Sequence, residues 1–230
     1  MIVKRWMSKP AITIDAEDSV REALKLMKQH NIKMLPALEE DKLVGVVSKG
    51  DLNQASTYDV FSRKNHELTD LIDRIKIKMV MTKHPITAPP DATIDETAQK
   101  LLLHNISRAP VQNASQKLVG VITKNDILQV LLSLTGINKK GIQLGLKIND
   151  RPGAIKEVTD IIRDYGGRVA NILSTGDRIQ DRYINIYMRV YGVNKPTLER
   201  IKEVIAETGS ILYIVDHEGK TREIYEEDLP

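Results

Sequence analysis

An internal repeat is the feature of this 230-residue sequence that most constrains its fold. Three short blocks of the first half recur 74 or 75 positions later, in the same order. The matched pairs are Met7–Lys9 with Met81–Lys83, His30–Pro36 with His104–Pro110, and Lys42–Asp51 with Lys117–Asp126. Ordered recurrence indicates two copies of one supersecondary unit. A unit this short cannot bury a good core alone, so we expect the two copies to pack against each other.

Both copies predict the same order of elements, β-α-β-β-α. In the first copy, apolar residues recur at helical spacing from Val20 to Met27, behind a cap at Asp18 or Ser19. Its expected elements are a strand over 12–14, this helix, strands over 34–38 and 43–47, and a helix from 48. The second copy predicts a strand over 86–88, a helix over 93–104, strands over 108–112 and 118–122, and a helix over 123–134.

Charged residues in a mixed pattern separate the two copies. We place the first motif at residues 7–56, the second at 80–135 and a solvated connector at 57–79. Within the connector, the segment from Arg74 to Lys78 alternates basic and apolar side chains. That alternation is also compatible with an exposed strand, a helix end or a basic contact surface.

Each copy contains the pattern Gly-apolar-apolar-Ser/Thr-x-x-Asp, from Gly45 to Asp51 and from Gly120 to Asp126. Together with the repeat, this pattern resembles the cystathionine β-synthase (CBS) motif, which occurs in tandem as a Bateman module. The resemblance covers residues 7–135. It implies a tandem pair of motifs with clefts that bind adenosine-type ligands.

An adenine nucleotide such as AMP or ATP is the ligand that this resemblance implies, and the residue types suit one. The aspartate of the pattern can accept hydrogen bonds from both ribose hydroxyls, and the Ser or Thr stands at a helix start, where free N–H groups favour phosphate. Arg108 lies where some nucleotide-binding CBS motifs contact phosphate, whereas the first copy has Met34 there. We therefore expect the second motif to bind phosphate better.

The predicted nucleotide-binding residues are Ser48, Asp51, Arg108, Thr123, Lys124 and Asp126, with Lys33 and Lys49 as further cations. A purely structural interpretation stays open for the two Ser/Thr-x-x-Asp segments. Each is also a capping box, which starts a helix whether or not it binds anything.

The second half of the chain predicts a different domain, with element order βαββαβ over residues 141–216. Alternation of apolar and polar residues indicates strands over 142–148, 169–173, 182–191 and 211–215, and helical spacing indicates helices after Pro152 and over 197–207. This order is that of a ferredoxin-like fold, so the predicted class is α+β or α/β throughout. We expect residues 217–230 to be a solvated polar tail.

The loop from Asn149 to Gly153, between the first strand and the first helix, makes this half resemble an ACT domain. ACT domains typically pair and bind an amino acid near that loop. The residues implied for amino-acid binding are Asp150, Gly153, Ala154, Ile155 and Asn171. The alternative is that Asp150 caps the helix and Pro152-Gly153 only shapes the turn.

Composition excludes several classes of function. The chain has no cysteine, which excludes disulfides, thiolate metal sites and cysteine nucleophiles. Its net charge of +3 and its few aromatic residues in the first half disfavour nucleic-acid binding. It shows no transmembrane run and no signal peptide, so we expect a cytoplasmic protein without membrane contact. We find no motif for a catalytic site or a metal, and expect a protein that is not an enzyme.

Two hypotheses remain for the function. The first is a homodimeric regulatory sensor that binds a nucleotide through its CBS pair and an amino acid through its ACT domain. The order of these domains resembles the bacterial acetoin utilisation family, which implies a role in acetoin or acetate-type carbon metabolism. The second is a dimeric scaffold that docks onto a regulated metabolic enzyme without binding a ligand. Asp51, Asp126 and Arg108 favour the sensor, whereas Met34 and, before the loop of the ACT-like half, Ile148 favour the scaffold.

Overall fold

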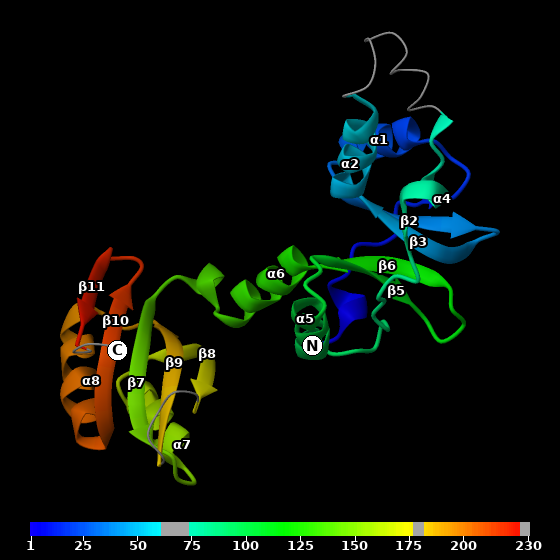
Figure 1. Cartoon of the computed structure of the whole chain (residues 1–230). Coiled ribbons are helices and arrows are strands. Elements are labelled where there is room, and N and C mark those ends of the chain that lie inside the picture. The colour runs from blue at the N-terminus through cyan, green and yellow to red at the C-terminus, as the bar shows by residue number, and fades with distance from the viewer. Residues whose placement is uncertain (61–73, 177–181, 226–230) are drawn as a thin grey trace. The chain divides into compact units, whose positions relative to one another are not determined.

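The computed structural model describes residues 1–60, 74–176 and 182–225. The chain divides into two compact units, Met1–Leu128 and Gln129–Pro230. Figure 1 shows their helices and strands. No helix in the described ranges combines the length and the hydropathy that crossing a bilayer requires.

The first repeat forms a four-stranded sheet covered by helices, with strand order β1-β2-β3-β4. Its main helix begins after Ser19, whose side chain accepts a hydrogen bond from Glu22 N, and its apolar positions Val20, Ala23 and Met27 are buried. The elements are β1 (Ile14–Asp15), α1 (Val20–Gln29), β2 (Met34–Glu39), β3 (Lys42–Ser48), α2 (Lys49–Val60), α4 (Ile77–Val80) and β4 (Thr82–Lys83).

The end of the connector is not solvated as predicted, because its apolar residues complete the core of the first repeat. Ile77 is fully buried among the residues of that core, and Ile75 packs against it. Val20 N donates to Ile75 O, and Ile77 N donates to Asp18 O. Arg74 and Lys78 are exposed, whereas Ile75 and Ile77 pack with the core at the start of α1. The part of the predicted connector at 61–73 lies outside the described residues.

The second repeat has the same plan in shorter form. Its first helix is held by a complete capping box, in which Thr93 and Glu96 each bond the other's backbone N–H. The predicted strand over 86–88 is reduced to a single bridge between Ala88 and Val111. The elements are α5 (Ile94–Leu103), β5 (Arg108–Gln112), β6 (Leu118–Thr123) and α6 (Lys124–Leu134), preceded in sequence by the short helix η1 (Val3–Arg5).

The two repeats exchange the segments that precede them. Ser8, which leads the first repeat, pairs with Val121 on β6 of the second. Reciprocally, Thr82 and Lys83 pair with β3 of the first repeat. This exchange explains the glycine of the repeated pattern. A Cβ on Gly120 would lie 2.7 Å from Met7 Sδ, and one on Gly45 would lie 2.5 Å from Met81 Sδ. Each glycine thus leaves room for the other repeat's methionine.

The second unit has the predicted βαββαβ order with one additional strand. Residues 221–224 of the predicted polar tail form β11, which pairs antiparallel with β10, so the sheet order is β11-β10-β7-β9-β8. Helices α7 and α8 contribute to one apolar core with the strands. The elements are η2 (Ile137–Lys139), β7 (Ile142–Asn149), α7 (Ala154–Asp164), β8 (Arg168–Thr175), β9 (Tyr183–Tyr191), α8 (Lys195–Thr208), β10 (Gly209–Asp216) and β11 (Thr221–Ile224).

Arg189 holds the segment that precedes β7 by hydrogen bonds to its backbone. Its guanidinium is almost fully buried and donates to Thr135 O, Lys140 O and Gln143 Oε1. Burial lowers the pKa of Arg189 from its ordinary value. Three acceptors satisfy the buried cation, which a buried charge requires.

Candidate functional site

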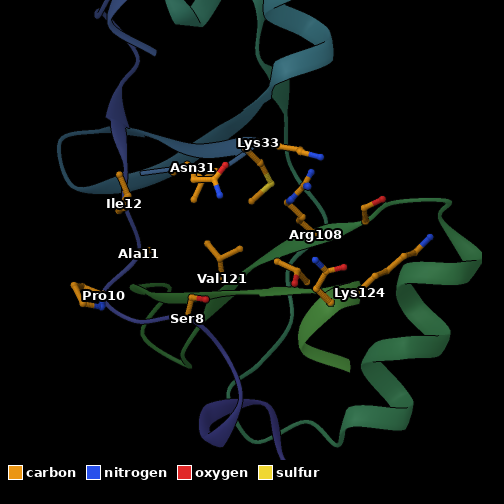
Figure 2. A pocket seen from close by; sticks show the side chains of 14 residues that line it. Ser8, Pro10, Ala11, Ile12, Asn31, Lys33, Arg108, Val121 and Lys124 are labelled. Atoms are coloured by element: carbon orange, nitrogen blue, oxygen red, sulfur yellow. The ribbon is translucent and has the colours of Figure 1, made fainter. Parts of the chain in front are cut away.

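A cavity of about 660 Å³ lies between the two repeats of the first unit (Figure 2). The first repeat and its leading segment contribute Ser8, residues 10–12 and residues 31–34. The second repeat contributes Ser107, Arg108, Val121 and residues 123–125. The exchange of leading segments places Ser8 here, since Ser8 and Val121 donate backbone hydrogen bonds to each other at 2.9 and 3.1 Å.

Strand pairing brings the repeated motif of the second repeat to one corner of the cavity. Arg108, the first residue of β5, lies opposite Thr123, the last residue of β6. Lys124 follows at the first position of α6. Of the predicted nucleotide-binding residues, the structure therefore brings Arg108, Thr123 and Lys124 together on the cavity wall.

Three cations line the cavity, and they come from both repeats. Lys33 precedes β2, whereas Arg108 and Lys124 belong to the second repeat. Figure 2 shows the side chains of Lys33 and Arg108 pointing toward the same part of the cavity. The lining, which consists of described residues only, includes no aspartate or glutamate. The cavity is therefore suited to an anion.

The two Ser/Thr-x-x-Asp segments act as capping boxes in this structure. Asp126 Oδ2 accepts from the backbone N and the hydroxyl of Thr123, both at 2.7 Å. Asp51 Oδ2 accepts from Ser48 N at 2.7 Å, and Asp51 N donates to Ser48 Oγ at 3.2 Å. Asp126, Ser48, Asp51 and Lys49 are not among the residues that line the cavity.

Three backbone N–H groups at the start of α6, which we expected to be free for a ligand, have partners within the second repeat. Thr123 N donates to Asp126, Asp126 N donates to Thr123 Oγ1, and Lys124 N donates to Ser107 O. These donors are already used to join α6 to its own repeat. Side-chain cations are consequently the main groups available to an anion in the cavity.

Sequence reasoning missed the contribution of the leading segment and of Asn31 to the cavity. Both reach it only because the repeats pack against each other, which no local pattern reveals. The recurrence of Met7–Lys9 as Met81–Lys83 was the one available clue.

The residues predicted for amino-acid binding do not form one site within the second unit. Gly153 caps α7 with φ 91°, followed by Ala154 and Ile155 in the first turn. Asp150 lies in the same loop, where its backbone N donates to Arg182 O. Asn171, however, lies opposite Arg189, which lies opposite Gln143 at the other end of β7. Six strand residues at about 3.4 Å each put Asn171 roughly 20 Å from the loop.

The basic side chain of this loop, Arg151, already has an ion-pair partner. Arg151 forms a two-pronged ion pair with Glu157 on α7, with N–O distances of 2.8 and 2.6 Å. The hydrogen bonds from Arg151 lower the pKa of Glu157. The loop is thus stabilised by its own helix.

Comparison with known proteins identifies the first unit. The CBS domain family model matches residues 3–58 and 77–133. The CBS domain pair of protein MJ0100, crystallised with 5′-methylthioadenosine and S-adenosyl-L-methionine, is 32% identical, with a TM-score of 0.50 over 58% of this chain and 97% of that one. The chain is a member of the CBS domain family.

Other proteins similar to the chain include two enzymes and a putative acetoin utilisation protein. L-aspartate semialdehyde sulfurtransferase of Methanocaldococcus jannaschii is 34% identical over 55% of this chain. Inosine-5′-monophosphate dehydrogenase of Korarchaeum cryptofilum is 34% identical over 53%. The chain spans only 22% of the length of either enzyme. A putative acetoin utilisation protein, AcuB, of Vibrio cholerae is 25% identical, with a TM-score of 0.51 over 60% of this chain and 96% of that one.

Proposed function

We propose that this protein is a non-catalytic regulator that senses an adenine nucleotide, AMP, ADP or ATP, through its CBS pair. The observation that carries the proposal is the cavity between the two repeats, lined by three cations and by no carboxylate among the described residues. The ligands of the MJ0100 CBS pair support an adenosine-bearing molecule in such a cavity. We assign no catalytic residue.

Arg108 and Lys124 are the residues proposed to hold the phosphate, because a guanidinium and an ammonium supply charged donors. Thr123 lies between them on the cavity wall. Asp126 is not among the residues that line the cavity, but it directly follows Asn125, which is. It holds the start of α6 through Oδ2, and we propose that its other carboxylate oxygen accepts from a ribose hydroxyl at the edge of the cavity. Ser48 and Asp51 are the corresponding residues of the first repeat, which we rank second because Met34 replaces the arginine there.

A homodimer is the proposed assembly, supported by exposed leucines on the second repeat. Leu102 and Leu103 on α5 are 70% and 79% exposed, and Leu128 on α6 is 56% exposed. The positions of the first repeat that correspond to Leu102 and Leu103 hold Lys28 and Gln29. Apolar side chains this exposed favour burial in an interface. Sedimentation of the L102E/L103E variant tests this: we expect monomers, and an unchanged mass would refute these leucines as the interface.

The regulated partner is proposed to be a metabolic enzyme, and the resemblance to the putative AcuB protein supports a role in acetoin or acetate-type metabolism. The chain matches 22% of the length of each of the two enzyme relatives, which supports an association of such a module with a metabolic enzyme. Docking on an enzyme without a ligand is the alternative.

An ACT-type role for the second unit stays a proposal that rests on the βαββαβ order and on the loop that begins α7. Amino-acid binding would use Asp150 and the backbone of Gly153, Ala154 and Ile155, without Asn171 of the same chain. Calorimetric titration with the amino acids, with and without nucleotide, tests this proposal. Absence of any heat at millimolar amino acid would refute it.

Calorimetric titration of the full chain with AMP, ADP and ATP tests nucleotide sensing. We expect saturable binding that weakens by about 1–3 kcal/mol in Asp126→Ala, the scale of a lost hydrogen bond to a charged group. Thr93→Ala is the matched control, since it also removes a capping box from the second repeat, that of α5, and Thr93 is neither a cavity residue nor a proposed binding residue. Absence of binding at millimolar nucleotide would refute the sensor and favour the scaffold.

A further inference from the structure

The charge pattern of the cavity bears on which adenosine ligands it can hold. Lys33, Arg108 and Lys124 all line it. Among the described residues, none of the three takes part in an ion pair. Three like charges around one space repel one another, and an anion between them removes that repulsion.

We propose that Lys33, Arg108 and Lys124 form a phosphate clamp contributed by both repeats, so that this cavity selects phosphorylated adenosine ligands and rejects the sulfonium cation S-adenosylmethionine. The inference rests on the proposed function and adds to it selectivity against a cationic adenosine ligand, a role for Lys33 of the first repeat and a stoichiometry. The MJ0100 CBS pair was crystallised with S-adenosyl-L-methionine, so a CBS pair can hold a cationic adenosine ligand, and phosphorylated and cationic ligands must be distinguished here.

Lys33 is the residue that the first repeat contributes to the clamp. It lies directly before β2, and its equivalent Ser107 lies directly before β5 and also lines the cavity. The two equivalent positions therefore both line the cavity, Lys33 with a cationic side chain and Ser107 with a hydroxyl. A ligand held by Lys33 and Arg108 at once would tie the first repeat to the second.

The clamp is asymmetric, and this predicts one ligand per chain. Met34, the equivalent of Arg108, is apolar and only 8% exposed. Ser48 and Lys49, the equivalents of Thr123 and Lys124, do not line the cavity. Among the described residues that line the cavity, the three cations therefore form one set, made by Arg108 and Lys124 of the second repeat with Lys33 of the first.

Coulomb's law gives the size of the expected selectivity. At an effective dielectric constant of about 20, two unit charges about 6 Å apart interact strongly enough to change affinity about 100-fold. Lys33 is exposed, so solvent screening reduces its share to about tenfold. A phosphate carries a charge of about −1.5 to −2 at neutral pH, whereas adenosine is neutral.

Calorimetry on the full chain at fixed ionic strength tests the clamp with four probes: ATP, AMP, adenosine and S-adenosylmethionine. We expect one site per chain, AMP and ATP bound at least tenfold more tightly than adenosine, and no displacement of AMP by millimolar S-adenosylmethionine. Lys33→Gln should weaken AMP and ATP about tenfold and change adenosine less than twofold. Lys33→Arg should restore binding, and Lys28→Gln, an exposed lysine on α1, should leave all four unchanged.

The possible failures are distinguishable. Adenosine or S-adenosylmethionine binding the wild type as tightly as AMP would overturn the clamp while leaving adenosine sensing intact, and this comparison needs no variant. An equal loss of AMP and adenosine affinity in Lys33→Gln would also overturn it. Absence of binding for all four probes would overturn the proposed function itself.

Discussion

Replacing Gly120 with alanine probes the exchange of leading segments on which the first unit depends. A Cβ at this position would lie 2.7 Å from Met7 Sδ and 2.8 Å from Ser8 O. The methionine side chain can move, but the Ser8 carbonyl cannot, because its backbone is paired with Val121. The substitution must therefore push the leading segment away from β6.

The expected cost follows from two opposing effects. Overpacking a well-packed site costs about 1–3 kcal/mol. Replacing glycine also restricts the unfolded chain, which stabilises the folded state by about 0.4–1 kcal/mol. We expect Gly120→Ala to lower the free energy of unfolding of the first unit by about 1–2 kcal/mol.

Chemical denaturation of the full chain, followed by circular dichroism and by the fluorescence of Trp6, measures this loss. Gly50→Ala is the matched control: Gly50 lies in the first turn of α2, and its nearest neighbour to a new Cβ would be Ser48 Oγ at an ordinary 3.4 Å. The control should be neutral or stabilising by up to about 1 kcal/mol. The reasoning is refuted if Gly120→Ala is as stable as wild type. A Met7→Ala/Gly120→Ala double variant should recover only part of the loss, since the Ser8 contact remains.

Three further outcomes are expected. Arg189→Met should lower the free energy of unfolding of the second unit by about 2–4 kcal/mol, because three acceptors lose their charged donor. The control Arg200→Met, at an exposed arginine, should change it by less than about 0.5 kcal/mol. Equal effects of the two variants in urea denaturation would contradict a stabilising role for the buried Arg189. Thr93→Ala should cost about 1 kcal/mol by removing the capping box of α5, and a change below the error of the same assay would count against it. Burial, together with the charges of Arg189 and Arg222, lowers the pKa of His217 from 6.5. The unfolded chain then binds this proton more readily, so the second unit should gain stability as pH rises from about 5 to 7. His217→Gln should flatten that dependence, and an unchanged slope of the urea midpoint against pH would contradict it.

The helices and their caps were predictable because the information that specifies them is local. Ser19 and Thr93 begin helices whose apolar residues recur at helical spacing, and the structure confirms both. His30 and His104 end those helices in both repeats. The βαββαβ order of the second half was equally readable from alternation and turn residues.

Contacts between distant segments were not predictable from these patterns. The segment containing Ile75 and Ile77 reads as a solvated alternation, yet Ile77 is part of the core of the first repeat and Ile75 packs against that core. The tail reads as a solvated end, and Thr221, Arg222 and Ile224 are indeed exposed, but the sequence pattern did not predict that residues 221–224 pair with β10 or that Lys202 pairs with Glu223. In both cases, the partner surface exists only after the rest of the domain has folded.

The sequence by itself determined that the first half of this chain contains two related repeats, where their helices begin, and which residue types could contact a nucleotide. Only the tertiary structure decided which of those residues share a cavity. It brought Lys33 of one repeat to Arg108 of the other, turned Ser48 and Asp51 to helix capping away from that cavity, and separated Asn171 from Asp150. The physical reason is that caps and periodicity act within a few residues, whereas a binding site is assembled by packing between segments far apart in the chain.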